Sequence, residues 1–231
     1  MFHSCSESCA ECATMHETPF GTVPPSMLAL VDEKKGTLNF KKGESIFHAD
    51  DPAQAFYCIS AGQVQLYRAS RAKEQAFGVY GPGTWLGYRN ALTGSAFDHS
   101  ARCLTSVKVC KVDRAVLEGF STRFPSFTKA IVRELASGWT ESEKQVYNLG
   151  ARNVKERLAE YLLSLRKDTL AESHDFDFPL TRETLASLMG TTTESVIRTL
   201  SDFRSRGWID YHDGKISLSN ERELEKLVVE S

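Results

Sequence analysis

Residues 127–149 read FTKAIVRELASGWTESEKQVYNL, and the spacing of their apolar side chains organises the rest of the chain. One narrow stripe recurs at alternating steps of three and four residues, and it consists of Val132, Leu135, Trp139, Ser142, Val146 and Leu149. This spacing is typical of a helix whose seam meets a partner helix. The stretch therefore predicts a long dimerisation helix. An amphipathic helix packed inside a monomer is the alternative.

The expected ends of this helix are Ser126 and Gly150. Ser126 can cap the first turn, and Gly150 ends the pattern about 23 residues on, which gives roughly 35 Å of helix at 1.5 Å per residue. Ser142 places a hydroxyl inside the seam. Small polar residues at such positions weaken association and specify register.

The composition is ordinary for a globular protein of one large or two modest domains. The chain has 231 residues, of which 41% are hydrophobic and 25% are charged. It lacks a run of about 20 apolar residues and the basic and apolar regions of a signal peptide. We therefore expect a cytoplasmic protein that has no membrane partner.

Three of the six cysteines, Cys5, Cys9 and Cys12, follow a C-x3-C-x2-C spacing in a polar N-terminal segment. Thiolates are the ligands of zinc and of iron–sulfur clusters, so the spacing predicts a metal site, with His16 as a candidate extra ligand. Radical S-adenosylmethionine enzymes also use this spacing. They carry an aromatic residue where this chain has Glu11, and no β/α repeat follows, so an enzyme is the remote alternative.

Residues 36–112 predict an antiparallel β-roll or barrel, because short β-rich runs alternate with turn signals and no helical period runs through them. The turns are expected at Lys42-Gly43, Asp50-Asp51-Pro52 and Ala61-Gly62. One last strand is expected to alternate through Leu104, Val107 and Val109.

The other three cysteines lie in this β region. Cys58 and Cys103 fall within strand patterns, and we expect them to be core residues. Cys110 lies near the end of the last expected strand and close in sequence to the long helix.

Beyond Asn153 the pattern becomes helical again. Residues 153–167 predict a helix with an apolar face, and Ser173 to Asp177 read as a polar linker. Residues 178–218 then predict a helix, a tight turn at Gly190, a second helix and a hairpin turning at Asp213-Gly214, which is a winged helix-turn-helix.

Helix caps support the two helices of this motif. Thr181 is the expected cap of the first helix, and Thr191 with Glu194 resembles a capping box for the second.

The second helix of this motif has an inward apolar face formed by Val196, Leu200 and Phe203. Its outward face consists of Thr193, Glu194, Ile197, Arg198 and Ser201. Arg can bind guanine, Glu can accept from cytosine and an apolar side chain can touch a thymine methyl group. We expect these residues to contact DNA, together with Arg182 and Lys215. A surface ion pair between Glu194 and Arg198, worth about 0.2–0.5 kcal/mol, is the alternative.

Three motifs in order resemble the CRP/FNR superfamily of bacterial transcription regulators. They are K-x-G-x-x-I-F at Lys41 to Phe47, A-G-x-V at Ala61 to Val64, and G-P-G-T-W-L-G at Gly81 to Gly87, followed by the long helix. The resemblance covers nearly the whole chain and implies an α+β fold. The implied parts are a cysteine-rich segment (1–20), an antiparallel β-roll or jelly roll (21–124), a dimerisation helix (125–150) and a winged helix-turn-helix domain (151–231).

The cyclic-nucleotide binders of this superfamily carry Gly-Glu and Arg-Ser/Thr-Ala in their phosphate cassette. The matching positions here are Gly87-Tyr88 and His99-Ser100-Ala101. The glutamate for the ribose and the arginine for the cyclic phosphate are missing, and with them the main charge-assisted bonds. We therefore do not expect cyclic AMP to bind.

The oxygen-sensing FNR branch holds a [4Fe–4S] cluster with N-terminal cysteines and one distal cysteine, and Cys110 in SVKVCKV matches the distal one. FNR-type chains have a further cysteine just before Pro-Phe, where this chain has Glu17 or Thr18. Four thiolates hold such a cluster. The resemblance therefore implies the altered set Cys5, Cys9, Cys12 and Cys110.

The resemblance implies a homodimeric regulator that responds to oxygen or redox state, reads a palindromic duplex and works with RNA polymerase. The family's E-x-x-x-R reading motif corresponds to Glu194 and Arg198, while Ile197 replaces the serine that usually precedes the arginine in the FNR branch. A regulator that senses nitric oxide or another small ligand in the β-roll, with zinc or no metal at the N-terminal cysteines, is the alternative.

Overall fold

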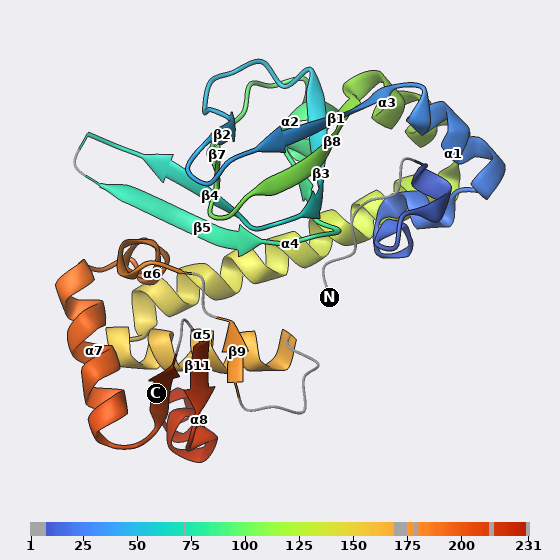
Figure 1. Cartoon of the computed structure of the whole chain (residues 1–231). Coiled ribbons are helices and arrows are strands. Elements are labelled where there is room, and N and C mark those ends of the chain that lie inside the picture. The colour runs from blue at the N-terminus through green and yellow to red at the C-terminus, as the bar shows by residue number, and fades with distance from the viewer. Residues whose placement is uncertain (1–7, 72, 169–174, 178–179, 213–214, 230–231) are drawn as a thin grey trace. The chain divides into compact units, whose positions relative to one another are not determined.

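A computed structural model describes residues 8–71, 73–168, 175–177, 180–212 and 215–229 (Figure 1). The chain forms two compact units, Met1–Trp139 and Thr140–Ser231. The long helix α4 (Pro125–Ala151) contributes to both units. Among the described residues, no helix is long and apolar enough to cross a membrane.

The first unit contains the expected antiparallel β-roll, built from two four-stranded sheets. One sheet has the order β1 (Lys35–Phe40), β8 (Val107–Asp113), β3 (Ala55–Ala61) and β6 (Trp85–Leu86). The other has the order β2 (Ser45–Phe47), β7 (Ser100–Cys103), β4 (Val64–Ala69) and β5 (Glu74–Tyr80). Every strand pair is antiparallel.

One hydrophobic core lies between the two sheets and includes Phe47, Ile59, Val64 and Val109. The turn between β3 and β4 needs Gly62, which has a φ of 89° and whose Cβ would collide with the carbonyl of Ser106. The turn expected at Ala61-Gly62 is therefore confirmed.

A second core covers the opposite face of the β1-β8-β3-β6 sheet. It is built from α1 (Pro25–Asp32), α2 (Tyr88–Thr93), α3 (Arg114–Arg123), the beginning of α4 and three 3₁₀ turns, η1 (Cys9–Glu11), η2 (Met15–Glu17) and η3 (Pro19–Thr22). The polar N-terminal segment therefore packs into the unit from Cys9 onward.

Several expectations for this unit were wrong. Helix α2 interrupts a region expected to lack helices. It follows Gly87, whose left-handed backbone separates the helix from the preceding strand. Leu104 lies in a turn between β7 and β8, so the single strand expected there is two strands. Cys110 lies in the middle of β8, and α3 separates this strand from α4.

The expected ends of the long helix were also wrong by one or two residues. Helix α4 begins at Pro125, and proline suits a first helical position because its missing N–H would have no partner there. The Ser126 hydroxyl instead donates to the Thr22 carbonyl at 3.1 Å. Gly150 remains helical and the helix ends at Ala151.

The second unit contains the expected winged helix-turn-helix. Helix α5 (Val154–Asp168) is followed by α6 (Arg182–Met189), α7 (Thr193–Ser205), the hairpin of β10 (Ile209–His212) and β11 (Lys215–Leu218), and α8 (Glu221–Val229). Gly190 ends α6 in a left-handed conformation, as the turn signal predicted. The turn expected at Asp213-Gly214 lies outside the described residues.

Two expectations for this unit need correction. Residues Asp175–Asp177 form β9, which pairs with β11, so this part of the expected linker is a strand. Thr181 caps α6 as predicted, but Thr192 rather than Thr191 caps α7, with its hydroxyl accepting from the Ser195 N–H at 3.2 Å. The capping box expected from Thr191 and Glu194 is therefore absent from this described stretch.

Candidate functional site

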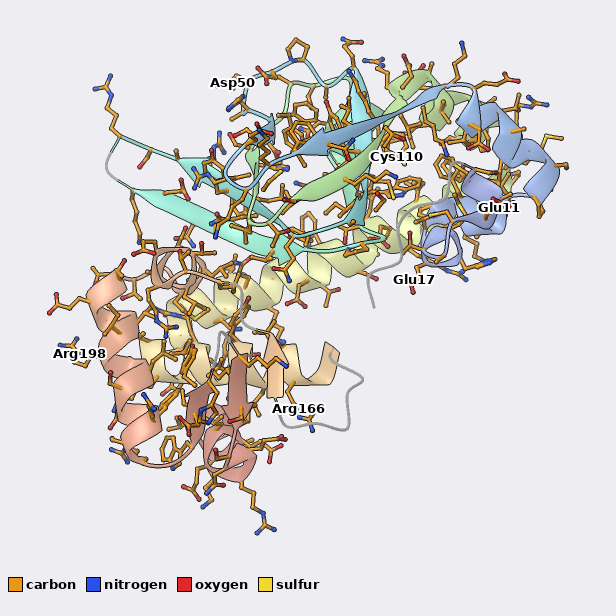
Figure 2. The ribbon with its side chains drawn as sticks, in the orientation of Figure 1. Glu11, Glu17, Asp50, Cys110, Arg166 and Arg198 are labelled. Carbon is orange, nitrogen blue, oxygen red and sulfur yellow. The ribbon has the colours of Figure 1, made fainter. Side chains whose placement is uncertain are left out.

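Four cysteines of the described chain line one cavity in the first unit. Cys9 and Cys12 come from the N-terminal turns, Cys58 from β3 and Cys110 from β8. Cys9, Cys12 and Cys110 are buried and Cys58 is half-buried. Figure 2 shows Cys110 inside the unit near the N-terminal turns, from which the exposed side chains of Glu11 and Glu17 project.

The two strand cysteines are direct neighbours across the sheet, because Cys58 is the register partner of Cys110. Directly opposed residues of antiparallel strands have side chains on the same face, with Cβ atoms about 4.5–5.5 Å apart. Cys103 packs instead into the core between the two sheets, as expected for a core residue. Cys58 was expected to be only a core residue, and its place at the cavity was missed.

The surroundings of Cys9 are polar on one side. Its N–H donates to Asp32 at 2.8 Å, and Lys35 Nζ lies 3.3 Å from the Cys9 sulfur and 2.7 Å from Asp32. Burial, reinforced by the Asp32 carboxylate, raises the pKa of Cys9 to about 12, whereas Lys35 opposes that rise. Cys9 is therefore a neutral thiol at pH 7, held beside a lysine that would stabilise its thiolate.

The four cysteines that line the cavity offer a donor set of thiols. Four thiols facing one cavity match the number and kind of ligands that a [4Fe–4S] cluster requires. Among the described residues, no three His, Cys, Asp or Glu side chains are grouped so that they could hold a metal ion in this conformation. The cavity measures about 20 Å³, room for about one water molecule, so it would have to widen to admit a cluster.

The remaining candidate ligands contribute less to this cavity. His16 is exposed and is not among the cavity's lining residues, although it was a candidate extra ligand. Thr18, one of the two positions matching the missing family cysteine, does line the cavity. Cys5 lies outside the described residues.

Aromatic side chains pack against the positions that match the nucleotide cassette. Phe47 stacks on Phe97 with ring centroids 4.0 Å apart, and the Phe97 ring lies where a Cβ at Gly87 would collide with it. His99 is 3% exposed and its ring lies edge-on to Phe47.

His99 is held in its neutral form. Its Nδ1 contacts the Asp98 carboxylate, so the proton belongs on Nδ1 and the buried Nε2 is left as an acceptor. Burial lowers the pKa of His99 and outweighs the opposing effect of Asp98. A buried neutral imidazole cannot replace the arginine that pairs with a cyclic phosphate.

The expected reading face of α7 is exposed in the second unit. Val196, Leu200 and Phe203 are buried as predicted, whereas Glu194, Ile197, Arg198 and Ser201 are exposed and Thr193 is half-buried. No ion pair joins Glu194 to Arg198, two described residues, so the surface-pair alternative is not supported. Figure 2 shows Arg198 pointing outward from α7.

Arg182 and Lys215 differ in how they are held. Arg182 donates to the Tyr211 hydroxyl at 2.7 Å and its guanidinium lies 4.5 Å from the centre of that ring. This contact ties the start of α6 to the wing strand β10. Lys215 is exposed at the start of β11.

The apolar seam of α4 is exposed in the single chain. Trp139 and Val146 are about seven-tenths exposed, with Val132, Leu135 and Leu149 also open and Ser142 exposed among them. Phe127 and Ile131, at the beginning of the helix, are buried in the first unit. Soluble proteins rarely leave a row of large apolar side chains uncovered, so the seam suits a partner helix.

Two family models match the chain: a cyclic nucleotide-binding domain over residues 37–123 and a Crp-like helix-turn-helix domain over residues 156–227. The CRP-like cAMP-activated global transcriptional regulator of Mycobacterium tuberculosis is 27% identical over 213 residues, which cover 89% of this chain and 93% of that protein. The fumarate and nitrate reduction regulatory protein of Vibrio cholerae is 26% identical over 230 residues, covering 96% and 91%.

The solved structure of FixK2 from Bradyrhizobium japonicum has the same fold, with a TM-score of 0.77 at 24% identity over 84% of this chain and 96% of that chain. The β-roll and the winged helix-turn-helix, matched in this order on one chain, make it a member of the CRP/FNR family of DNA-binding transcription regulators.

Proposed function

We propose that this regulator senses oxygen or redox state through a [4Fe–4S] cluster bound in the first unit. The observation that carries the proposal is the convergence of thiols from the N-terminal turns and the sheet on one cavity. Cys9, Cys12 and Cys110 would hold the cluster together with a fourth thiol, for which the sequence alone offered Cys5. Bound there, such a cluster supplies reactivity toward oxygen, and the protein supplies the response.

The residues that would carry the response lie next to the cavity. Phe20, from η3, stacks on Phe127 of α4 with ring centroids 5.2 Å apart, and Ser126 of α4 donates to Thr22. Any shift of the N-terminal turns therefore changes the packing at the beginning of the dimerisation helix. Two states that differ in how they hold these turns are sufficient for coupling.

The output would be recognition of a palindromic DNA site by a homodimer. The exposed α4 seam would pair two chains, and each chain would present Glu194 and Arg198 to base edges in the major groove. RNA polymerase would then be the partner at promoters.

Cyclic AMP, which activates the Mycobacterium tuberculosis relative by name, is not the signal that this site favours. Phe97 and His99 fill the region matching the cassette, and neither can pair with a cyclic phosphate. We expect millimolar cyclic AMP to leave both the melting temperature and the DNA affinity unchanged. A saturable rise in either quantity would instead support a nucleotide-responsive regulator.

The deciding experiment is anaerobic reconstitution of the full chain with ferrous iron and sulfide, followed by iron and sulfide analysis and visible absorption. We expect roughly four irons and four sulfides per chain, lost on exposure to air. Cys110→Ser should reduce loading as strongly as Cys9→Ser, because each removes one thiolate, while Cys103→Ser should keep it. A wild-type chain that binds zinc or no metal would favour the alternative of a regulator that senses nitric oxide or another small ligand.

A further inference from the structure

We infer that Cys58 is the fourth thiolate ligand, and that it completes a set with Cys9, Cys12 and Cys110. This inference rests on the proposed cluster and specifies its ligands. It replaces Cys5, which the sequence alone offered, by a residue on strand β3. The sulfur donors would then be divided evenly between the N-terminal turns and the sheet.

Cys58 lies beside Cys110 in the sheet. Cys58 is the register partner of both Cys110 on β8 and Trp85 on β6, so the three side chains share one face. Trp85, Cys58 and Cys110 all line the cavity. The sheet therefore presents two adjacent thiols to the N-terminal turns from a rigid central position.

Cys103, the third cysteine in the β-roll, differs from Cys58 and Cys110 in its placement. Cys103 is 1% exposed and packs with Val64 and Val107 between the sheets. Cys103 lies on β7, in the other sheet, and its side chain faces the core between the sheets. The cavity lies on the opposite face of the β1-β8-β3-β6 sheet, so Cys103 cannot reach it. Cys103 thus provides a matched control for the loss of a strand thiol.

Glu17 and Thr18 occupy the two positions that match the remaining cysteine of the family pattern. Glu17 is exposed, with its carboxylate close to Gly83, whereas Thr18 is buried and lines the same cavity as Cys58. The cavity therefore has a hydroxyl at this point of its N-terminal wall and a thiol at its β3 wall. The total remains four thiols within the described residues.

A structural role for Cys58 is the competing explanation, because a small apolar thiol can simply fill space beside Trp85 and Phe56. Such a role would change stability without changing the iron content of folded protein. Thermal unfolding of each variant must therefore accompany the iron analysis.

The test compares the full-length wild type with Cys58→Ser, Cys5→Ser and Cys103→Ser after the same anaerobic reconstitution. Iron and sulfide per chain, visible absorption and thermal unfolding are measured for each. We expect Cys58→Ser to retain less than half of the wild-type iron and to lose the remainder faster in air. Cys5→Ser and Cys103→Ser should keep the wild-type content.

A second variant separates ligand loss from damage to the strand. Thr18→Cys combined with Cys58→Ser returns a fourth sulfur to the cavity from the opposite wall, and we expect it to restore iron and sulfide to near the wild-type content. Restoration would not follow if Cys58→Ser had merely disturbed β3.

Two results would overturn the assignment in distinguishable ways. If wild type loads a cluster and Cys58→Ser loads it equally well, Cys58 is not a ligand, while the proposed function stands. Loss of loading in Cys5→Ser at the same time would identify Cys5 as the fourth ligand. If wild type takes up no iron and sulfide, both the ligand assignment and the proposed sensing function fail.

Discussion

Phe20 stacks on Phe127 with ring centroids 5.2 Å apart and an interplanar angle of 28°. Phe20 also lies 4.8 Å from the ring of Trp85, which lines the thiol cavity, so it is packed between the cavity and α4. Phe20 is 3% exposed and Phe127 is fully buried. A rearrangement of the N-terminal turns cannot leave Phe127 unaffected, because close-packed interiors transmit displacement.

Phe20→Ala should therefore have two effects. It should lower the free energy of unfolding by about 3–5 kcal/mol, the usual cost of truncating a buried phenylalanine. It should also reduce the difference in DNA affinity between reconstituted and air-exposed protein. Denaturant unfolding and DNA titrations provide these measurements. Phe77→Ala is the control, because Phe77 is 41% exposed on β5, and an equal loss of coupling in that variant would exclude a special role for Phe20.

The sequence predicted well those elements that depend on local patterns. Thr181 was identified as a cap and Gly190 as a turn because each acts on backbone within a few residues. The inward face of α7 followed from the helical period, which tertiary packing preserved for Val196, Leu200 and Phe203.

Features that depend on long-range pairing could not be predicted in this way. Strand β9 exists because residues 175–177 pair with β11, far along the chain, and three polar or aromatic residues give no local signal for a strand. The strand pattern around Cys58 was visible in the sequence, so Cys58 was assigned to the core. That Cys110 is its neighbour across the sheet depends on the register in which β3 and β8 pair. Alternation along β3 and β8 would have placed the two cysteines on one face only if their pairing had been known.

Acid should destabilise the first unit through His99. Burial lowers the folded-state pKa of His99 below its ordinary value near 6.5, so the unfolded chain binds the proton more readily. The contribution of neutral His99 to the free energy of unfolding is complete above pH 6.5. It is lost as the pH falls from 6.5 toward the folded-state pKa of His99. For one proton, the free energy of unfolding changes by at most about 1.4 kcal/mol per pH unit.

His99→Leu should make unfolding less dependent on pH between 6.5 and 5, as measured by denaturant titrations at several pH values. The control is His48→Gln, because His48 is exposed in the same unit. Asp98 opposes the lowering of the His99 pKa. The pKa of the Asp98 carboxyl is itself lowered from its ordinary value of 3.8, so protonation of Asp98 affects stability only below that pH. An unchanged slope in His99→Leu would show that His99 does not control this pH response.

Arg198→Ala should weaken binding to the specific DNA site by about 1–3 kcal/mol and relax the preference at one base pair. Arg198 is exposed on α7 and forms no ion pair with Glu194, so its removal should leave the described helix folded. Lys215→Ala should weaken all sequences alike, since a phosphate contact carries no sequence information. Binding-site selection with each variant measures the difference.

Arg182→Ala and Arg222→Ala complete that comparison. Arg182→Ala should weaken all DNA sequences and also lower stability, because it removes the contact with Tyr211 that ties α6 to the wing. Arg222 is exposed on α8, outside the helix-turn-helix, and its substitution should leave base preference unchanged. If Arg198→Ala retained every wild-type base preference, Arg198 would not be a reading residue.

The last prediction concerns Ser142 and the strength of the dimer. An acidic residue at this seam position would face its own copy in the partner helix and repel it, whereas serine is neutral and small. Large apolar neighbours such as Trp139 and Val146 remain available for burial on either side. We therefore expect wild type to remain dimeric at micromolar concentration both when reconstituted and after exposure to air, so that control would operate through the packing of α4 and the N-terminal turns.

Sedimentation of wild type, Ser142→Asp and Ser142→Leu under both conditions tests this expectation. Ser142→Asp should shift the air-exposed protein toward monomer, and Ser142→Leu should tighten the dimer, because one variant adds like charges and the other adds apolar area to the seam. Trp139→Glu should dissociate the chain under both conditions, since it removes the largest exposed side chain of the seam. If air-exposed wild type sediments as a monomer and Ser142→Leu restores the dimer, control operates by dissociation, and Ser142 sets how readily the two helices separate.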